Sequence, residues 1–274
     1  MSELRSFEVP AGTMRYLDRG EGAPIVLVHG NPSSSHEFEG VVELLGDGYR
    51  CIAPDHIGFG ASAKPADWDY LPESHAANLA ALLDSLDLRD VTMVVGDWGG
   101  PIGLSWALDN PERVAAVVVT NTWLWPVNRT LYYQGFSKFM GGPLGRFLTT
   151  RYNFFAKQVT RRAWGRARPL TPELLERFTG VHTRPEERKG MWVFPRQITG
   201  STDWLRSLWE RRDSLREADM ALLWGMRDIA FREDVLERWI AEFPDAAVAR
   251  LPEAGHFVSL EAPEAVAAAV RARR

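Results

Sequence analysis

Asp97 is the residue whose surroundings most clearly suggest chemistry. It lies in Gly96-Asp97-Trp98-Gly99-Gly100, directly after the apolar, β-branched run of residues 91–95. A buried strand, a tight glycine-rich turn and a helix together lift one side chain above a parallel sheet. A carboxylate in that position can attack sp³ carbon and leave an alkyl ester on the enzyme. The alternative is that Asp97 only caps the helix that follows.

An alkyl ester has to be hydrolysed, so we searched for a histidine that could activate water. His256 lies between the last predicted strand (246–251) and the last predicted helix, which begins at Pro263. Asp228 follows the preceding core strand (218–225) at the same edge of the sheet and could orient His256. The order Asp97, Asp228, His256 is nucleophile, acid, histidine, although Asp228 alone could be a turn residue.

Five further histidines accompany His256 in the sequence. His29 precedes a Gly-Asn-Pro turn, and we expect it to pack or to hydrogen-bond locally. The other four lie in predicted loops or helices, and we expect them to be solvated: His36, His56, His75 and His182.

Strands that alternate with helices position these residues. Apolar strands are predicted at 24–28, 50–54, 91–95, 114–120, 218–225 and 246–251, with amphipathic helices between several of them. This alternation predicts a mostly parallel sheet covered by helices on both faces. From about residue 125 to 216 only helical stretches and turns are apparent. We therefore predict a core of residues 1–122 and 217–274, with residues 123–216 inserted as a helical cap.

Composition limits the possible functions. The chain has 274 residues, 45% hydrophobic, and a net charge of −4, so no overall basic charge favours nucleic acid. No apolar run reaches the ~18 residues of a membrane span. The single cysteine, Cys51, cannot form an intrachain disulfide, which suits a reducing compartment. We expect a soluble, cytoplasmic protein that needs neither metal nor cofactor and has no nucleic-acid or membrane partner.

The predicted cap has an unusual charge distribution. No Asp or Glu occurs between Glu112 and Glu173, whereas nine basic residues lie between Arg129 and Arg168. A solvated basic face is the expected explanation. An anionic substrate or a contact in a homo-oligomer is the alternative.

These motifs together resemble those of the α/β-hydrolases and, within them, the haloalkane dehalogenases. The resemblance covers nearly the whole chain and is weakest in the cap. The motifs that carry it are His29-Gly30-Asn31-Pro32, the loop 55–62, Val95-Gly96-Asp97-Trp98-Gly99-Gly100, Gly225-Met226-Arg227-Asp228 and Gly255-His256-Phe257. It implies an α/β-hydrolase fold and hydrolysis of carbon–halogen bonds in small halogenated compounds, with halide, alcohol and a proton as products.

The resemblance also implies roles for two residues beside Asp97. In that family a tryptophan after the nucleophile holds the leaving halide with its indole N–H, and Trp98 matches it. Asn31 matches an asparagine that supplies the second halide donor, and the backbone N–H groups of both residues would form the oxyanion hole. Some members place the acid after the strand that follows the elbow helix, where this chain has Asn121. The combination resembles the third subfamily, which uses an acid at the position of Asp228.

Three other functions compete with this interpretation, and the residues after Asp97 argue against one of them. Epoxide hydrolases share an aspartate nucleophile and use two cap tyrosines, for which Tyr132, Tyr133 and Tyr152 are available. Fluoroacetate dehalogenases need arginines soon after the nucleophile, and Trp98-Gly99-Gly100-Pro101 offers none. A non-catalytic ligand-binding relative would leave the complete set of Asp97, Asp228 and His256 unexplained.

Overall fold

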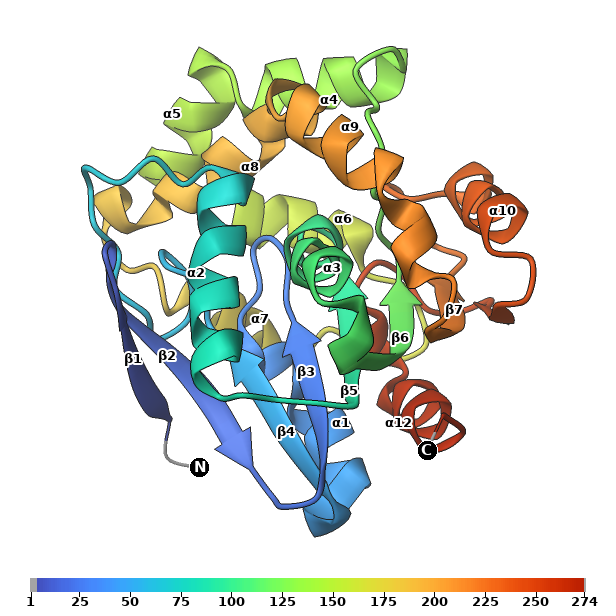
Figure 1. Cartoon of the computed structure of the whole chain (residues 1–274). Helices are drawn as coiled ribbons and strands as arrows, with labels where there is room; N and C mark the ends of the chain where they lie inside the picture. Colours follow the sequence, from blue (N-terminus) through green and yellow to red (C-terminus); the bar gives the residue numbers. More distant parts are fainter. Residues whose placement is uncertain (1–3, 274) are drawn as a thin grey trace.

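The computed structural model describes residues 4–273, which are organised around one eight-stranded sheet (Figure 1). Its strand order is β1-β2-β4-β3-β5-β6-β7-β8. The outer pairs β1–β2 and β2–β4 are antiparallel, and the remaining pairs are parallel. The strands are β1 (Arg5–Val9), β2 (Gly12–Arg19), β3 (Ala23–Val28), β4 (Tyr49–Pro54), β5 (Val91–Gly96), β6 (Val114–Thr120), β7 (Asp219–Gly225) and β8 (Ala247–Leu251).

Helices cover both faces of the sheet because the central strands are apolar on both sides. Along β5, Met93 and Val95 belong to one hydrophobic cluster and Val94 to the other, as the two-residue period of a strand requires. The first cluster contains the apolar faces of α2 (Pro72–Ser85), α3 (Gly99–Asp109) and α10 (Glu233–Glu242). The second contains those of α1 (Glu39–Leu45) and α12 (Pro263–Arg271). The predicted mostly parallel, two-sided sheet is confirmed.

Between β6 and β7 the described chain forms helices and turns but no strand. The α-helices are α4 (Leu131–Met140), α5 (Pro143–Tyr152), α6 (Thr160–Ala163), α7 (Pro172–Thr179), α8 (Lys189–Gly200) and α9 (Thr202–Glu210). Figure 1 shows α4, α5, α8 and α9 beyond the carboxyl ends of the parallel strands. The division into a core and a cap at residues 123 and 216 stays a prediction. No helix within residues 4–273 is long and apolar enough to cross a membrane.

The expectation of four solvated histidines was wrong. All four are buried, at 1–7% exposure: His36, His56, His75 and His182. A neutral imidazole can be buried in this way because it packs as a small aromatic ring. The ring of His75, for example, lies 4.6 Å from that of Trp68 and 4.9 Å from that of Phe194. Polarity of a residue type does not by itself reveal such a cluster in a sequence.

Burial keeps these histidines neutral in the folded state. It lowers the pKa of His182 to about 4, although a hydrogen bond to the carbonyl of Gly58, at 2.9 Å, opposes the shift. In the unfolded chain the imidazole takes up a proton below its ordinary pKa of 6.5. Between pH 6.5 and 4 the unfolded state therefore binds more protons, and the free energy of unfolding falls as the pH falls.

We predict that His182→Gln flattens this acid dependence. The glutamine N–H can still donate to Gly58, but it does not titrate. The free energy of unfolding, measured with urea between pH 6.5 and 4, should fall less steeply than in the wild type, by up to ~1 kcal/mol per pH unit. Between pH 7.5 and 8.5 the two proteins should give parallel curves. Equal slopes in the acid range would show that His182 is protonated in the folded protein.

Candidate active site

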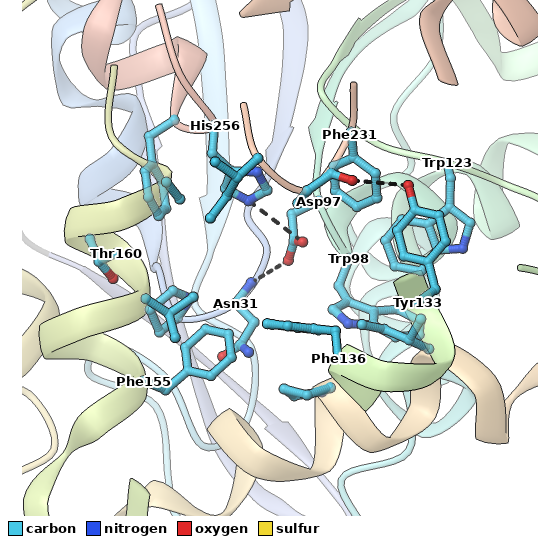
Figure 2. Close-up of a pocket in the computed structure, with 18 of the residues that line it drawn as sticks. Asn31, Asp97, Trp98, Trp123, Tyr133, Phe136, Phe155, Thr160, Phe231 and His256 are labelled. Carbon is cyan, nitrogen blue, oxygen red and sulfur yellow. Dashed lines mark hydrogen bonds and ion pairs between the residues drawn. The ribbon is translucent and has the colours of Figure 1, made fainter. Parts of the chain in front are cut away.

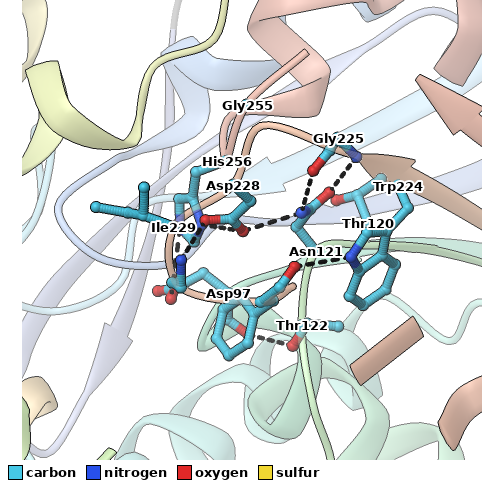
Figure 3. A network of polar contacts seen from close by, with 12 residues as sticks. Asp97, Thr120, Asn121, Thr122, Trp224, Gly225, Asp228, Ile229, Gly255 and His256 are labelled. Atoms are coloured by element: carbon cyan, nitrogen blue, oxygen red, sulfur yellow. Dashed lines mark hydrogen bonds and ion pairs between the residues drawn. The ribbon is translucent and has the colours of Figure 1, made fainter. Parts of the chain in front are cut away.

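Asp97 occupies a strained turn at the carboxyl end of β5. Its φ of 46° lies in the left-handed region that side chains other than glycine rarely adopt. Its backbone N–H donates to the carbonyl of Asn121 at 3.1 Å, and its carbonyl accepts from the hydroxyl of Thr122 (Figure 3). A Cβ at Gly100 would meet the Thr122 hydroxyl at 2.0 Å, so this turn requires glycine there. The surrounding contacts thus hold the strained backbone and fix the direction of the carboxylate.

Backbone N–H groups stabilise the Asp97 carboxylate. The N–H of Asn31 donates to Oδ1 at 2.7 Å. A Cβ at Gly30 would lie 2.3 Å from the same oxygen, so glycine permits this approach. Burial raises the pKa of Asp97, while the charge of His256 and the N–H groups of Asn31 and Trp98 oppose the shift. Two N–H groups that converge on one carboxylate are also placed to stabilise an oxyanion formed at its carbon.

His256 lies between two carboxylates (Figure 3). Its Nδ1 lies 2.9 Å from Oδ2 of Asp228, and its Nε2 lies 3.6 Å from Oδ2 of Asp97. Burial lowers the pKa of His256, but the charge and hydrogen bond of Asp228 and the charges of Asp97 and Glu37 outweigh burial and raise it to about 9. The imidazole therefore carries a proton in the resting protein at neutral pH. The structure brings the three predicted residues together.

Asn121 holds the carboxylate that orients His256. The Asp228 side chain is inaccessible to solvent, and its Oδ2 accepts a hydrogen bond of 2.9 Å from the amide of Asn121. Its Oδ1 accepts from the N–H of Ala230 at 2.7 Å. The Asn121 amide also bonds both backbone groups of Gly225, at 2.7 and 3.1 Å. Asn121, at the end of β6, thereby fixes Asp228, at the end of β7, in one orientation.

The chain after α6 supports the loop that carries His256. The N–H of His256 donates to the carbonyl of Ala163 at 2.9 Å. The buried carboxylate of Glu261, on the short helix α11 (Val258–Glu261), accepts from the N–H groups of Gly165 at 2.8 Å and Gly255 at 3.0 Å. Ala163 and Gly165 are thus bonded to His256 and Glu261, which lie more than ninety positions later in the sequence. These bonds fix the loop that carries His256.

An apolar pocket lies above Asp97 (Figure 2). Asp97, His256, Asn31 and Trp98 contribute the reactive and polar groups next to the nucleophile. Aromatic and aliphatic side chains form most of the remaining wall: Pro32, Trp123, Tyr132, Tyr133, Phe136, Phe155, Val159, Ala163, Pro195, Ile198, Ile229, Ala230, Phe231 and Phe257. No Lys or Arg is among the described residues that line it. The pocket therefore suits a small, uncharged, apolar molecule.

The two predicted halide donors lie beside the nucleophile. Figure 2 shows Asn31 and Trp98 at the same end of the pocket as Asp97. The Trp98 ring is 2% exposed and stacks on Phe194 at 5.4 Å, which fixes its plane. Within residues 4–273 we find no hydrogen bond from its indole N–H. Both side chains can therefore donate to a group in the pocket.

The basic residues of the predicted cap lie elsewhere. None of the nine lines the pocket around Asp97, and all nine are exposed. Lys138, Arg146 and Arg151 instead border a separate surface groove. An anionic substrate at Asp97 is thus not supported by the residues that surround it.

His29 supports the turn that carries Asn31, as expected of a local hydrogen-bonding role. Its Nδ1 donates to the carbonyl of Gly30 at 2.7 Å, and its Nε2 accepts from the N–H of His56 at 3.0 Å. Sequence reasoning missed the contributions of Thr122, Glu261 and the buried Glu37. The only sequence feature that could have pointed to these three residues is that each is polar and lies within a few residues of a motif. Polar residues near motifs are also common in surface loops, so this feature does not identify them.

Comparison with known proteins agrees with this geometry. Residues 23–263 match the family model described as alpha/beta hydrolase fold. Haloalkane dehalogenase 2 of Mycobacterium tuberculosis is 36% identical over 270 residues, which cover 98% of this chain and 93% of that protein. The chain belongs to the haloalkane dehalogenases of the α/β-hydrolase fold.

Two further relatives show that similar chains carry different named activities. The crystal structure of haloalkane dehalogenase DatA from Agrobacterium tumefaciens C58 has a TM-score of 0.85 and 28% identity, covering 98% of this chain and 95% of that one. A cis-3-alkyl-4-alkyloxetan-2-one decarboxylase of Xanthomonas campestris is 32% identical, covering 96% of this chain and 92% of that protein. Dehalogenases and an oxetanone decarboxylase thus share this scaffold.

We predict that the ends of β6 and β7 can exchange the acid that orients His256. Asp228→Asn should slow turnover of 1-bromobutane by ~10²–10⁴-fold, as in other triads that lose their orienting acid. Adding Asn121→Glu should restore part of the activity, because residue 121 already contacts Asp228 and a longer carboxylate can reach Nδ1. Asp219→Asn, at an exposed acid of β7, is the matched control and should leave the rate unchanged. A fully active Asp228→Asn variant would mean that another group orients His256.

Proposed function

We propose that this protein is a haloalkane dehalogenase that cleaves carbon–halogen bonds through an alkyl ester on Asp97. One observation carries the proposal. The Asp97 carboxylate is held by backbone N–H groups at the base of an apolar pocket, with His256 on one side and two side-chain donors on the other. This arrangement provides a nucleophile, a leaving-group site and a base for one substrate.

The first step forms the ester. A carboxylate oxygen of Asp97 attacks the carbon that bears the halogen, and the electron pair of the breaking bond leaves with the halide. The amide of Asn31 and the indole N–H of Trp98 donate to the departing halide. Neutral donors that are already oriented stabilise this developing charge without the reorganisation that water would need.

The second step needs His256 as a base, and the first step makes it one. Ester formation neutralises Asp97, which removes one of the charges that raise the pKa of His256. The imidazolium then gives its proton to solvent more easily, which is the proton that the overall reaction releases, and the neutral ring can accept one from water. Water attacks the carboxyl carbon of Asp97, and the N–H groups of Asn31 and Trp98 stabilise the oxyanion. On collapse His256 protonates the leaving alcohol, and the proton left on the Asp97 carboxyl group passes to His256, which regenerates both groups.

The other functions considered from the sequence are less well supported. The hydroxyl of Tyr132 donates to the carbonyl of Ile229 at 2.7 Å, and that of Tyr133 to Ala230 at 2.9 Å. Tyr152 is 54% exposed and does not line the pocket. None of the three tyrosines is therefore placed as the acid that an epoxide hydrolase requires. A non-catalytic relative would have no need of the assembled Asp97, His256 and Asp228.

The partners of the enzyme and its compartment can be proposed from its pocket and from Cys51. We propose small halogenated organic compounds and water as its partners, because most of the pocket wall is apolar and no Lys or Arg of the described chain lines it. We place it in the cytoplasm, where its buried, unpaired Cys51 would stay reduced. A homo-oligomer contact through the basic residues of the cap, the alternative given above, stays untested.

We predict halide and alcohol release from 1-bromobutane and 1,2-dibromoethane. Asn31→Ala and Trp98→Phe should each slow halide release by roughly 10²–10³-fold, the usual effect of losing one oriented donor. Both should leave the hydrolysis of an ester already formed on Asp97 less affected. Stopped-flow halide detection separates the two steps. Trp209→Phe, at a tryptophan outside the pocket, is the control.

Two parallel assays identify the competing activities. Styrene oxide tests diol formation, and a cis-3,4-dialkyloxetan-2-one tests loss of carbon dioxide. Turnover of either compound without halide release from any haloalkane would contradict the proposed function.

A further inference from the structure

Glu37 is a buried carboxylate that the mechanism above does not use. It lies on the 3₁₀ helix η1 (Ser35–Phe38), six residues after Asn31, and is 7% exposed. No Lys or Arg forms an ion pair with it within residues 4–273. Burial raises its pKa to about 7, opposed by the hydroxyl of Ser33 and the charge of His256, while the charge of Asp97 raises it further. An acid that is buried without a direct ion pair is costly, so its position requires an explanation.

Glu37 lines a small cavity next to the nucleophile. Gly30, Asn31 and Gly96 form part of its wall, and the side chains of Asp97, His256 and Glu37 face it. The substrate pocket shares Asn31, Asp97, His256 and Phe257 with this cavity but does not reach Glu37. Asp97 therefore borders two spaces. One is large and apolar, and the other is small and lined by two acids and an imidazole.

The two spaces match the two steps of the proposed reaction. The alkyl group arrives on Asp97 from the apolar pocket and then occupies that side of the ester. Water must reach the carboxyl carbon from another direction, within hydrogen-bonding distance of His256 Nε2. A water molecule bound inside a protein needs two to four polar partners. The small cavity offers His256 and Glu37 as partners beside that carbon.

Building on the proposed function, we propose that Glu37 is a further catalytic residue that holds the hydrolytic water against the Asp97 ester. One hydrogen of the water is donated to the Glu37 carboxylate, and the other points to His256 Nε2. The water oxygen bonds to the carboxyl carbon while its proton passes to Nε2. The bond from that carbon to the alkyl oxygen then breaks, and the alcohol takes the proton from His256. Asp97 keeps one oxygen from water.

The charge of Glu37 adds a second contribution to this step. The charges of three carboxylates raise the pKa of His256: Asp228, Asp97 and Glu37. Ester formation removes the charge of Asp97 at the stage when His256 has to become an imidazolium. The charge of Glu37, which also raises the pKa of His256, remains and stabilises the imidazolium that forms.

The test separates the two steps in Glu37→Leu and Glu37→Gln. Rapid quench with excess enzyme measures halide, which reports ester formation, and alcohol, which reports hydrolysis. In Glu37→Leu, halide should appear at the wild-type rate, and alcohol should appear roughly 10–100-fold more slowly, as expected when a hydrogen bond to a charged group is lost. In Glu37→Gln, hydrolysis should be intermediate, because the amide oxygen can still accept from water. Glu39→Gln, an exposed neighbour paired with Arg177, is the control.

A second measurement does not depend on activity. The His256 ring pKa, followed by NMR, should fall in both variants because one of the three carboxylate charges that raise it is lost. A role limited to packing would leave it unchanged in Glu37→Gln. If Glu37→Leu does not fold, the rates and titration of Glu37→Gln decide.

The possible failures are distinguishable. No halide release by the wild type overturns the proposed function and this inference with it. Halide release followed by alcohol at the wild-type rate in Glu37→Leu overturns only the role of Glu37. Equal slowing of both steps, or an unchanged His256 pKa, would also overturn it, since Glu37 would then act on the structure alone.

Discussion

The site depends on balancing three buried carboxylates against one imidazole. Asp97, Asp228 and Glu37 all lie close enough to His256 for their charges to raise its pKa. Without that cation, and without backbone N–H groups at the oxygens, burying so much negative charge would be prohibitive. Because the balance includes the nucleophile, esterification of Asp97 changes the proton affinity of His256. Ester formation therefore lowers the pKa of His256, which lets His256 act as the base in the second step.

The fold satisfies this constraint by bringing each group to the same edge of one sheet. Asp97 follows β5, Asn121 follows β6, Asp228 follows β7 and His256 follows β8. Parallel strands that end at the same edge place these loops side by side, whatever their separation in sequence. Short contacts then fix each group, such as the bond from the Asn121 amide to Asp228. The helices beyond this edge add the apolar wall that excludes water from the pocket.

Sequence patterns revealed what is local and missed what depends on packing. The strand, turn and helix around Asp97, and the positions of Asp228 and His256 after their strands, were predictable because they follow periodicity and chain order. Asn121 was noticed only as a position that lacks an acid, because its contact with Asp228 spans 107 residues. Glu37 and the buried histidines were missed for the same reason. Whether a polar side chain meets solvent or a cavity depends on neighbours that are distant in sequence.

The proposed reaction passes through a covalent ester at Asp97 whose hydrolysis requires His256. Its most direct test is intact-protein mass spectrometry of His256→Gln after mixing with 1-bromobutane. The account predicts a mass increase of one butyl group, located on Asp97 by peptide mapping, with about one equivalent of bromide released per enzyme and no further turnover. An unmodified His256→Gln protein that turns over at the wild-type rate would contradict it.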